Sequence, residues 1–313
     1  MLSSHAGYSR VFQPGKLTFG FILPLESYPL MPWPTLEHHV ELAQLADNAG
    51  FSSLWLRDVP FFDPQFGDTG QILDPFVYLG ALANATKNIA LGTTGIVLPL
   101  RDPVITAKQA LSVDFLSGGR FILGLSTGDR PTEYPAFGID FESRDARFRD
   151  EWKIIETLTQ KNFPKARTEF YGYFNGHLTM MPKPASKKIP TIVVGRARQE
   201  ISWIAEHSDG WLWHVGDFEQ LGGLISWWRS LLAPGVFKPY GYATFFDLDE
   251  NPERPLQRDF NGIRIGRKAL ISLWEQQQQA GVSHIALNLK TASRPANEIL
   301  QEMAEFILPH FSS

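Results

Sequence analysis

Eight short apolar segments, rich in β-branched and aromatic residues, alternate along this chain with segments of helical periodicity. The apolar segments are LTFGFILP (17–24), SSLWLRDV (52–59), ALGTTGIVL (90–98), RFILGLS (120–126), PTIVVG (190–195), GWLWHV (210–215), YGYATFFDL (240–248) and HIALNLK (284–290). Strands that alternate with helices predict a parallel sheet. Eight such repeats within 313 residues predict an α/β fold of the (β/α)8 (TIM) barrel type.

Turn and cap residues mark the starts and ends of the helices between the predicted strands. Asp74 with Pro75 and Pro103 begin helices, and Gly50 ends one. Thr35 is expected to cap the helix that follows the first strand. A doubly wound sheet is the alternative, but the sequence LPLESYPLMPWP after the first strand lacks the G-x-G-x-x-G phosphate loop. We therefore expect the barrel.

We expect one domain over residues 17–313, preceded by an N-terminal extension over residues 1–16. Residues 161–190 interrupt the regular pattern, because this stretch is too long for an ordinary connection between a helix and a strand. Its aromatic and turn-rich character predicts a hairpin insertion. The hairpin either lies over the mouth of the barrel or is a plain solvent-facing insertion.

Composition excludes several classes of function. A formal net charge of −4 argues against a nucleic-acid surface. The chain has no cysteine, which excludes disulfides, thiol nucleophiles and thiolate metal sites, and it shows no other metal-binding motif. The N-terminus lacks the apolar core of a signal peptide, and no run reaches the roughly 18 apolar residues of a membrane helix. We expect a cytoplasmic protein with no membrane partner.

The active site of a barrel lies at the C-terminal ends of its strands. Three of these ends carry small residues that let a large planar ligand approach the backbone: Thr93-Thr94-Gly95, Ser126-Thr127-Gly128 and Gly195-Arg196-Ala197-Arg198. Gly195 and the two arginines precede a helix, so they either bind a phosphate through amides and charge or are simply solvated.

These segments resemble the bacterial luciferase-like flavin-dependent oxidoreductases over residues 17–311. The pieces that carry the resemblance are ELAQLADNAGFSSLWL, the long run from NIALGTTGIVLPL through LSGGRFILGLSTGDR, IPTIVVG with SWIAEHSDGW, and GIRIGRKALISLWEQQQQAGVSHIALNLK. The resemblance implies a (β/α)8 barrel with an insertion, FMN or the deazaflavin F420 as the cofactor, and a homodimer. A flavin reductase that supplies reduced FMN is the partner that it suggests.

The resemblance also assigns cofactor-binding positions. Thr94 and Gly95 would lie beneath the isoalloxazine, often with a non-prolyl cis peptide between such residues, and Thr93 precedes them. Ser126, Thr127 and Gly128 would contact the ring and phosphate. The phosphate loop would comprise Gly195, Arg196, Ala197, Arg198 and Gln199, with Ala197 where relatives often carry a hydroxyl.

One departure from the family follows the second strand. The luciferases show a Glu-His-His run there, with a catalytic histidine, whereas this chain has Arg57 and Asp58. Light emission from a long-chain aldehyde is therefore not expected. Asp58 or Arg57 either replaces the catalytic histidine or belongs to a structural ion pair.

Aromatic side chains near the mouth suggest a substrate pocket, with Trp33, Phe61, Phe62 and Phe66 on loops and His214 at the end of the sixth strand. The four aromatic residues either cover the flavin or close the barrel core, and His214 either faces the mouth or is structural. The expected function is a monooxygenase that uses reduced FMN and dioxygen on a small apolar or aromatic substrate. The alternatives are F420-dependent hydride transfer and flavin binding without turnover.

Overall fold

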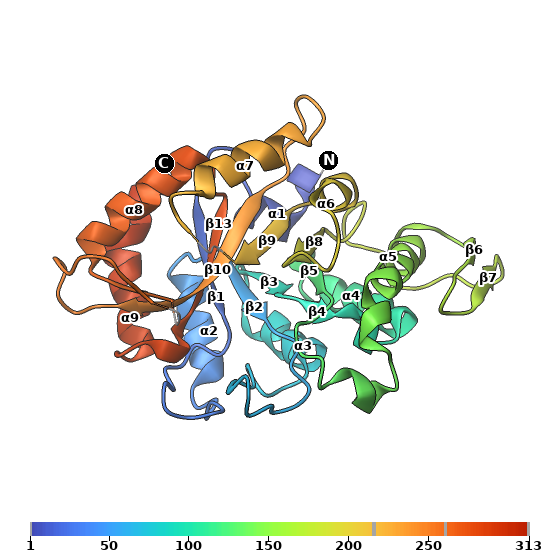
Figure 1. Cartoon of the computed structure of the whole chain (residues 1–313), viewed down its shortest axis with the longest axis horizontal. Coiled ribbons are helices and arrows are strands. Elements are labelled where there is room, and N and C mark those ends of the chain that lie inside the picture. Colours follow the sequence, from blue (N-terminus) through green and yellow to red (C-terminus); the bar gives the residue numbers. More distant parts are fainter. Residues whose placement is uncertain (1, 215–216, 260–261, 312–313) are drawn as a thin grey trace.

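The computed structural model describes residues 2–214, 217–259 and 262–311, and within them eight parallel strands close into a barrel (Figure 1). The barrel strands are β1 (Thr18–Ile22), β2 (Ser53–Leu56), β3 (Ala90–Thr93), β5 (Phe121–Ser126), β8 (Thr191–Val194), β9 (Trp211–His214), β10 (Tyr240–Leu248) and β13 (His284–Asn288). Closure is complete because β10 pairs with both β9 and β13, and β13 pairs with β1. The predicted (β/α)8 barrel is confirmed.

Helices surround the strands and follow them in the expected order. They are α2 (His39–Asn48), α3 (Pro75–Ala85), α4 (Pro103–Leu116), α5 (Arg144–Gln160), α6 (Ile201–His207), α7 (Leu221–Ser230), α8 (Arg267–Ala280) and α9 (Ala296–Glu302). The Asp74 and Asp102 carboxylates cap α3 and α4, each accepting from two amides. The prediction of Thr35 as a cap is wrong, because α2 begins only at His39. The Thr35 hydroxyl accepts the Glu37 amide at 3.1 Å in the turn before the helix, and Glu26 binds the amides of Thr35 and Leu36 at 2.9 Å each.

The barrel interior is filled by the indole of Trp55, and this explains the first glycine of the third strand. A Cβ at Gly92 would lie 2.2 Å from Trp55 Cζ3, so only glycine leaves room for the ring. Trp55 Nε1 donates to His284 Nε2 at 2.9 Å. Burial lowers the pKa of His284 from 6.5 to about 3, so the imidazole stays neutral inside the barrel.

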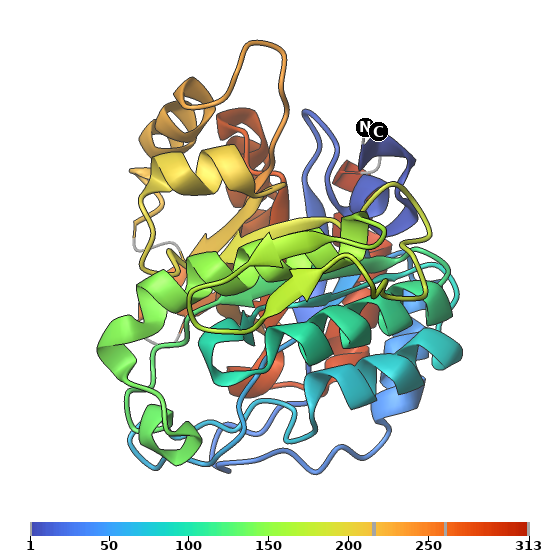
Figure 2. The ribbon, with the colours of Figure 1, turned by 90° about the vertical axis from the view of Figure 1, so that its right-hand side faces the viewer.

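The N-terminal end of the barrel is closed by α1 (Ala6–Val11). The Tyr8 hydroxyl donates to the carbonyl of Asp209 at 2.8 Å, and the Gly7 amide donates to the carbonyl of Gly119 at 3.1 Å. A Cβ at Gly7 would lie 2.3 Å from the carbonyl oxygen of Arg120, which explains this glycine. Figure 2 shows both termini at this end, opposite the long loops that follow β1 and β2.

The insertion contains a hairpin of β6 (Lys165–Arg167) and β7 (Tyr173–Asn175), but it does not cover the mouth. It lies along the outer side of α5 (Figure 1), where the amides of Glu169 and Phe170 donate to Asp150. Of the two readings left open by the sequence, the structure supports the solvent-facing insertion, for a topological reason. The insertion joins the end of α5 to the start of β8, and both of these lie at the N-terminal end of the barrel.

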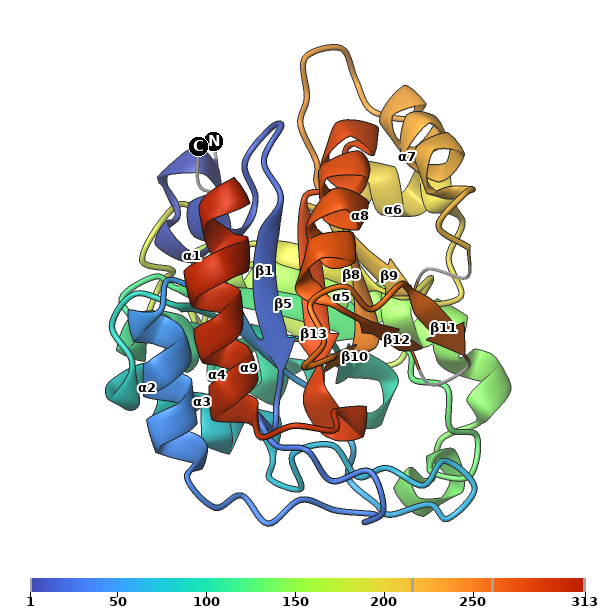
Figure 3. The same ribbon diagram turned by 90° about the vertical axis from the view of Figure 1, so that its left-hand side faces the viewer.

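Three short strands extend the sheet beyond the barrel. They are β4 (Ile96–Val97), β11 (Gln257–Asp259) and β12 (Gly262–Ile265). β4 pairs with β5, while β12 pairs with the end of β10 and with β11 (Figure 3). Of the helices in the described ranges, none combines the length and the apolar character that crossing a membrane requires.

Candidate functional site

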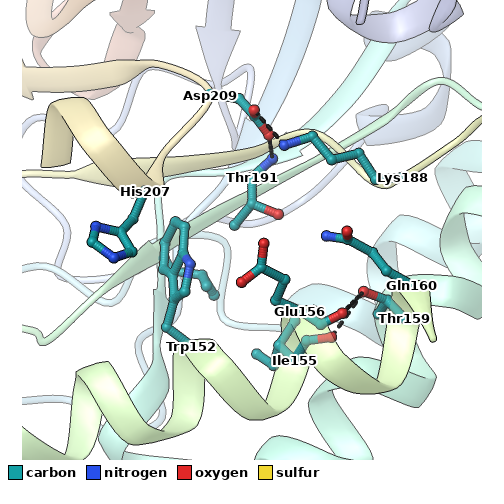
Figure 4. Close-up of a pocket in the computed structure, with 10 residues that line it drawn as sticks. Trp152, Ile155, Glu156, Thr159, Gln160, Lys188, Thr191, His207 and Asp209 are labelled. Carbon is teal, nitrogen blue, oxygen red and sulfur yellow. Dashed lines mark hydrogen bonds and ion pairs between the residues drawn. The ribbon is translucent and has the colours of Figure 1, made fainter. Parts of the chain in front are cut away.

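The long connections after β1 and β2 lie at the carboxyl ends of the strands, which form the mouth of the barrel (Figure 3). A separate small cavity of about 20 Å³ lies at the opposite end, between α5 and β8 (Figure 4). Its residues include the ion pair of Lys188 Nζ with Asp209 Oδ1 at 2.6 Å. A cavity of this size has room for about one water molecule. The mouth is therefore the candidate active site.

The ends of β3 and β5 approach each other closely because Gly124 has no side chain. A Cβ at Gly124 would lie 1.9 Å from the carbonyl oxygen of Thr93. The Thr93 hydroxyl donates to the carbonyl of Gly124 at 2.7 Å and accepts from its amide at 2.8 Å. Thr93 is fully buried, so its side chain joins the strands beneath the mouth and has no hydroxyl free for a ligand.

The next two residues, Thr94 and Gly95, follow β3 at the mouth end of the barrel. The peptide bond between Thr94 and Gly95 is cis, as the sequence led us to expect. A Cβ at Gly95 would lie 3.0 Å from Val194 Cγ2, and the Ser126 hydroxyl is 3.3 Å from the carbonyl oxygen of Gly95. The structure thus brings the ends of β3, β5 and β8 together, as predicted. The Thr94 hydroxyl there is buried and has no hydrogen-bond partner among the described residues.

The turn after β8 has three residues in the left-handed backbone region. Gly195, Ala197 and Arg198 have φ angles of +67°, +45° and +57°. The amides of residues 196–198 have no partner within the described part of the chain. Consecutive amides in such a turn form a concave site for anions. The Arg198 side chain is exposed, whereas that of Arg196 lies 3.8 Å from Glu200.

Two predicted cofactor residues instead hold the loops in place. Gln199 is buried: its side chain accepts from Arg149 Nε at 2.5 Å and donates to the carbonyl of Asp145 at 3.1 Å, which joins the turn to α5. The buried Thr127 accepts the Tyr134 hydroxyl on its carbonyl at 2.5 Å. Gly128 has a φ of +67°, and a Cβ there would lie 2.9 Å from Val97.

Asp58 and Arg57 do not pair with each other. Asp58 accepts from Arg101 Nε at 2.7 Å and Arg101 Nη2 at 2.6 Å, and it also accepts the Val97 amide at 3.0 Å. Its carboxylate is therefore fully committed to the framework. Of the two readings left open by the sequence, the geometry of Asp58 supports the structural ion pair.

Arg57 belongs to a charged cluster on the other side of the mouth. Its Nη1 lies 2.5 Å from Asp68 Oδ2, and Lys290 Nζ lies 3.6 Å from Asp68 Oδ1. Burial alone would raise the pKa of Asp68, but Arg57 and Lys290 hold it at about 2. Nε and Nη2 of Arg57 are buried without a hydrogen-bond partner among the described residues. No sequence pattern indicated Asp68, which lies in the middle of a long loop.

Glu133, in the loop after β5, is a second titratable residue that sequence reasoning missed. It is 6% exposed, and one of its carboxylate oxygens lies 3.9 Å from Arg130 Nη1. Burial raises the pKa of Glu133 to about 6, although Arg130 opposes the shift. Its position five residues beyond Gly128 could have indicated it, because strand-end loops carry the functional groups of barrels.

The predicted pocket aromatics are on the surface of the mouth loops rather than in the barrel core. Trp33, Phe61, Phe62 and Phe66 are each 42–49% exposed. The Trp33 and Phe62 rings meet edge to face at 5.7 Å, and Arg130 lies over the Phe66 ring at 4.8 Å. His214 is exposed at the end of β9. These exposures exclude the reading in which the four aromatic residues close the core.

Comparison with known proteins decides the family. The model of the luciferase-like monooxygenases matches residues 17–237. The chain belongs to this family. Among luciferase-like relatives, 4-hydroxyprotoasukamycin monooxygenase of Streptomyces nodosus subsp. asukaensis is 30% identical over 173 residues, which cover 55% of this chain and 45% of the relative. The present chain is therefore an enzyme of the luciferase-like class, and no light-emitting activity follows from the family name.

Two solved structures share the luciferase-like fold. An F420-dependent secondary alcohol dehydrogenase, in complex with an F420-acetone adduct, superposes with a TM-score of 0.76 at 17% identity, covering 95% of this chain and 99% of that one. The oxygenating constituent of 3,6-diketocamphane monooxygenase of Pseudomonas putida, in complex with FMN, superposes with a TM-score of 0.72 at 14% identity, covering 94% and 98%. At these identities the likeness shows the fold alone.

The residues at the mouth fit a flavin or deazaflavin. The unpartnered Thr94 hydroxyl lies beside Gly95 and Ser126, small residues that let a planar ring system approach the backbone. The turn with the free amides of residues 196–198 directly follows β8, at the same strand end. A ring with a phosphate-bearing side chain requires these two features together.

Proposed function

We propose that this chain is a flavin-dependent monooxygenase that uses reduced FMN and dioxygen to oxidise a small organic molecule. The observation that carries the proposal is the buried, unpartnered Thr94 hydroxyl where the ends of β3, β5 and β8 converge. A buried hydroxyl without a partner costs about 1–3 kcal/mol, so it is expected to bond to a ligand. Bound flavin would supply the electron transfer that amino acid side chains cannot perform.

The roles of the residues follow from their positions. Gly95 and Ser126 would support one face of the ring, and the Thr94 hydroxyl would bond to its polar edge. The amides of residues 196–198 would hold the phosphate, with the exposed Arg198 adding charge. Helix α6, which starts only at Ile201 and has seven residues, is not needed for this role.

The loops that carry Trp33, Phe62 and Phe66 would exclude water from the active site. Trp33 and Phe62 already touch across the loops after β1 and β2, and Arg130 fixes Phe66 from the loop after β5. With cofactor and substrate bound, closer packing of these rings would dry the reacting centre. Glu133, with its raised pKa of about 6, can hold or release a proton near neutral pH at this side of the mouth.

Equilibrium titrations with FMN, reduced FMN and F420, followed by absorbance and fluorescence, test the proposal. Tighter binding of either form of FMN than of F420 supports it, together with substrate-stimulated oxygen uptake. Preference for F420 would instead make the protein a hydride-transfer enzyme without oxygen. Binding of FMN with no turnover on any tested compound would leave a flavin-binding protein, and no binding of any of the three would overturn the flavin assignment.

We also propose that the protein is a homodimer that receives reduced FMN from a separate reductase. Apolar side chains are exposed on α3 and α4, where Val77, Ile105 and Phe115 are 74%, 56% and 66% accessible. Exposed apolar surface of this kind is typical of an interface. Light scattering at micromolar concentration should give twice the chain mass, whereas a monomer would contradict the dimer.

A further inference from the structure

We propose that the side of the mouth formed by the ends of β1, β2 and β13 binds the anionic group of the substrate. The substrate would then be an apolar or aromatic organic anion, such as a carboxylate, with Arg57 as the group that recognises its charge. This inference rests on the proposed function, because it concerns the substrate of the same mouth.

The free edge of the Arg57 guanidinium is the first observation. Arg57 uses Nη1 for Asp68, while its Nε and Nη2 are buried without a hydrogen-bond partner in the described part of the chain. This edge faces Gly70, whose Cβ position lies at an ordinary van der Waals separation, 3.5 Å from Nε and 3.6 Å from Nη2. Parallel N–H groups on one edge of a guanidinium are the donors that bind both oxygens of a carboxylate.

Charge balance is the second observation. Arg57 and Lys290 both contact a single carboxylate, that of Asp68, which also accepts the Tyr28 hydroxyl at 3.3 Å. Burial raises the pKa of Tyr28, so this hydroxyl stays neutral. Arg130 donates to the Asp68 carbonyl at 3.0 Å, and its own charge is opposed by Glu133 at 3.9 Å. Arg57 and Lys290 together therefore exceed the charge of Asp68 by one, which an anionic ligand would neutralise.

An apolar cavity adjoins this charge. The loop after β1 borders an open cavity with a volume of about 420 Å³. Its apolar lining consists of Tyr28, Pro29, Leu30, Met31, Trp33 and Pro34; Glu26 also lines it, with its carboxylate bonded to the amides of Thr35 and Leu36. This volume falls within the usual range of about 300–1,000 Å³ for small-molecule sites. Such walls favour a hydrocarbon or aromatic body over a highly hydrated ligand such as free phosphate.

Tyr28 joins the cavity to the charged cluster. Tyr28 is one of the residues around the cavity, its hydroxyl donates to Asp68, and Lys290 Nζ lies 5.3 Å from its ring centroid. The two loops are also tied directly, because the Thr69 hydroxyl donates to the Pro32 carbonyl at 3.0 Å. An apolar body in the cavity would thus place its anionic head beside Arg57. The proposed flavin would occupy the remaining side of the mouth, at β3, β5 and β8.

A matched pair of probes tests the inference without catalysis. Calorimetric titration of the full chain with 3-phenylpropionate and with 3-phenylpropan-1-ol compares a carboxylate with a neutral ligand of the same body. The dissociation constant should be at least about tenfold lower for the carboxylate, since a charge-assisted pair adds roughly this factor. Equal affinity for the two probes, or no binding of either, would overturn the anion subsite.

Variants locate the subsite. Arg57→Met should abolish the preference for the carboxylate, while Arg57→Lys should keep part of it because the charge remains without the fork. Lys108→Met, which removes a cation on α4 that binds the carbonyl of Met181, is the matched control and should keep the full preference. A preference that survives in folded Arg57→Met would overturn the role of Arg57. If Arg57→Met does not fold, the comparison of the two probes on the unsubstituted chain and on Arg57→Lys still decides.

The same samples separate this inference from the proposed function. An FMN titration is run beside each probe titration. Carboxylate preference without binding of FMN or F420 would refute the flavin proposal but uphold the anion subsite. If the protein binds FMN but binds the two probes with equal affinity, the flavin proposal is upheld and the anion subsite is refuted.

Discussion

Asp58 and Arg101 form a two-bonded ion pair, with Arg101 Nε and Nη2 at 2.7 and 2.6 Å from the two carboxylate oxygens. The pair ties the loop after β2 to the start of α4, and Arg101 also contacts Asp74, the cap of α3, at 2.8 Å. The Asp58 side chain is only 4% exposed. This geometry gives the position after β2 a structural role in a place where related luciferases carry a catalytic histidine.

Removal of this ion pair should cost stability. Arg101→Met leaves the Asp58 carboxylate buried without its main partner, so the free energy of unfolding should fall by about 3 kcal/mol. Urea denaturation measures the loss. Arg198→Met is the control: this arginine is exposed and has no ion pair among the described residues, so its unfolding free energy should change by less than about 0.5 kcal/mol.

The same control variant tests the phosphate site. Arg198→Met should weaken FMN binding severalfold while leaving the binding of riboflavin, which lacks the phosphate, unchanged. Fluorescence titration with both ligands measures the two affinities. An equal loss for FMN and riboflavin would place Arg198 near the ring, and no loss for either would remove it from the site.

Neighbouring threonines should respond in opposite ways. Thr93→Val removes a hydroxyl with two hydrogen bonds to Gly124, so the unfolding free energy should fall by about 1–2 kcal/mol. Thr94→Val removes a buried hydroxyl without a partner, so stability should stay constant or rise, while FMN affinity should fall severalfold. Thermal denaturation and FMN titration of both variants give the four values. Equal FMN affinity in Thr94→Val and the unsubstituted chain would count against the proposed contact.

Gly92 should not tolerate a side chain. In Gly92→Ala the new methyl group would meet the Trp55 ring, and such overpacking costs about 1–3 kcal/mol or more. Gly80→Ala provides the comparison, because nothing lies within 4 Å of its Cβ position in the middle of α3. Alanine should raise stability there by about 0.5–1 kcal/mol. The denaturation midpoint should shift down in Gly92→Ala and up in Gly80→Ala. An unchanged midpoint in Gly92→Ala would show that the Trp55 ring can move.

His284 should make stability depend on pH. Its pKa is about 3 in the folded protein and 6.5 in the unfolded chain, so the unfolded state binds more protons between these values. The free energy of unfolding should therefore fall as the pH drops from 6.5 towards 3. His284→Gln should flatten this slope relative to the unsubstituted chain, while exposed His177→Gln should not. The comparison isolates His284, since Glu133 and Glu151, whose pKa values are raised, are present in every variant.

Local sequence signals predicted much of the architecture. Helices begin at Asp74-Pro75 and at Pro103 as expected, with Asp74 and Asp102 as their caps, and the small residues of β3, β5 and β8 do meet at the mouth. These features depend on neighbouring residues or on the fixed direction of barrel strands. Gly92 is different, because its neighbour Trp55 lies on another strand and only the closed barrel brings them together.

The parts that the sequence did not predict depend on how loops fold back. Glu26 binds the amides of Thr35 and Leu36 in the turn where a helix start was expected, and Asp68 returns from the middle of a long loop to meet Arg57. Asp150 accepts two amides of the insertion, which therefore packs against α5 and does not cover the mouth. Each of these contacts joins residues whose separation carries no periodic signal.

A crystal of the protein soaked with FMN tests the central claim most directly. The account predicts the isoalloxazine against Thr94 and Gly95, the Thr94 hydroxyl bonded to it, and the phosphate on the amides of residues 196–198. FMN bound at another place on the molecule, or absent from the mouth at a concentration that saturates the protein in solution, would contradict it.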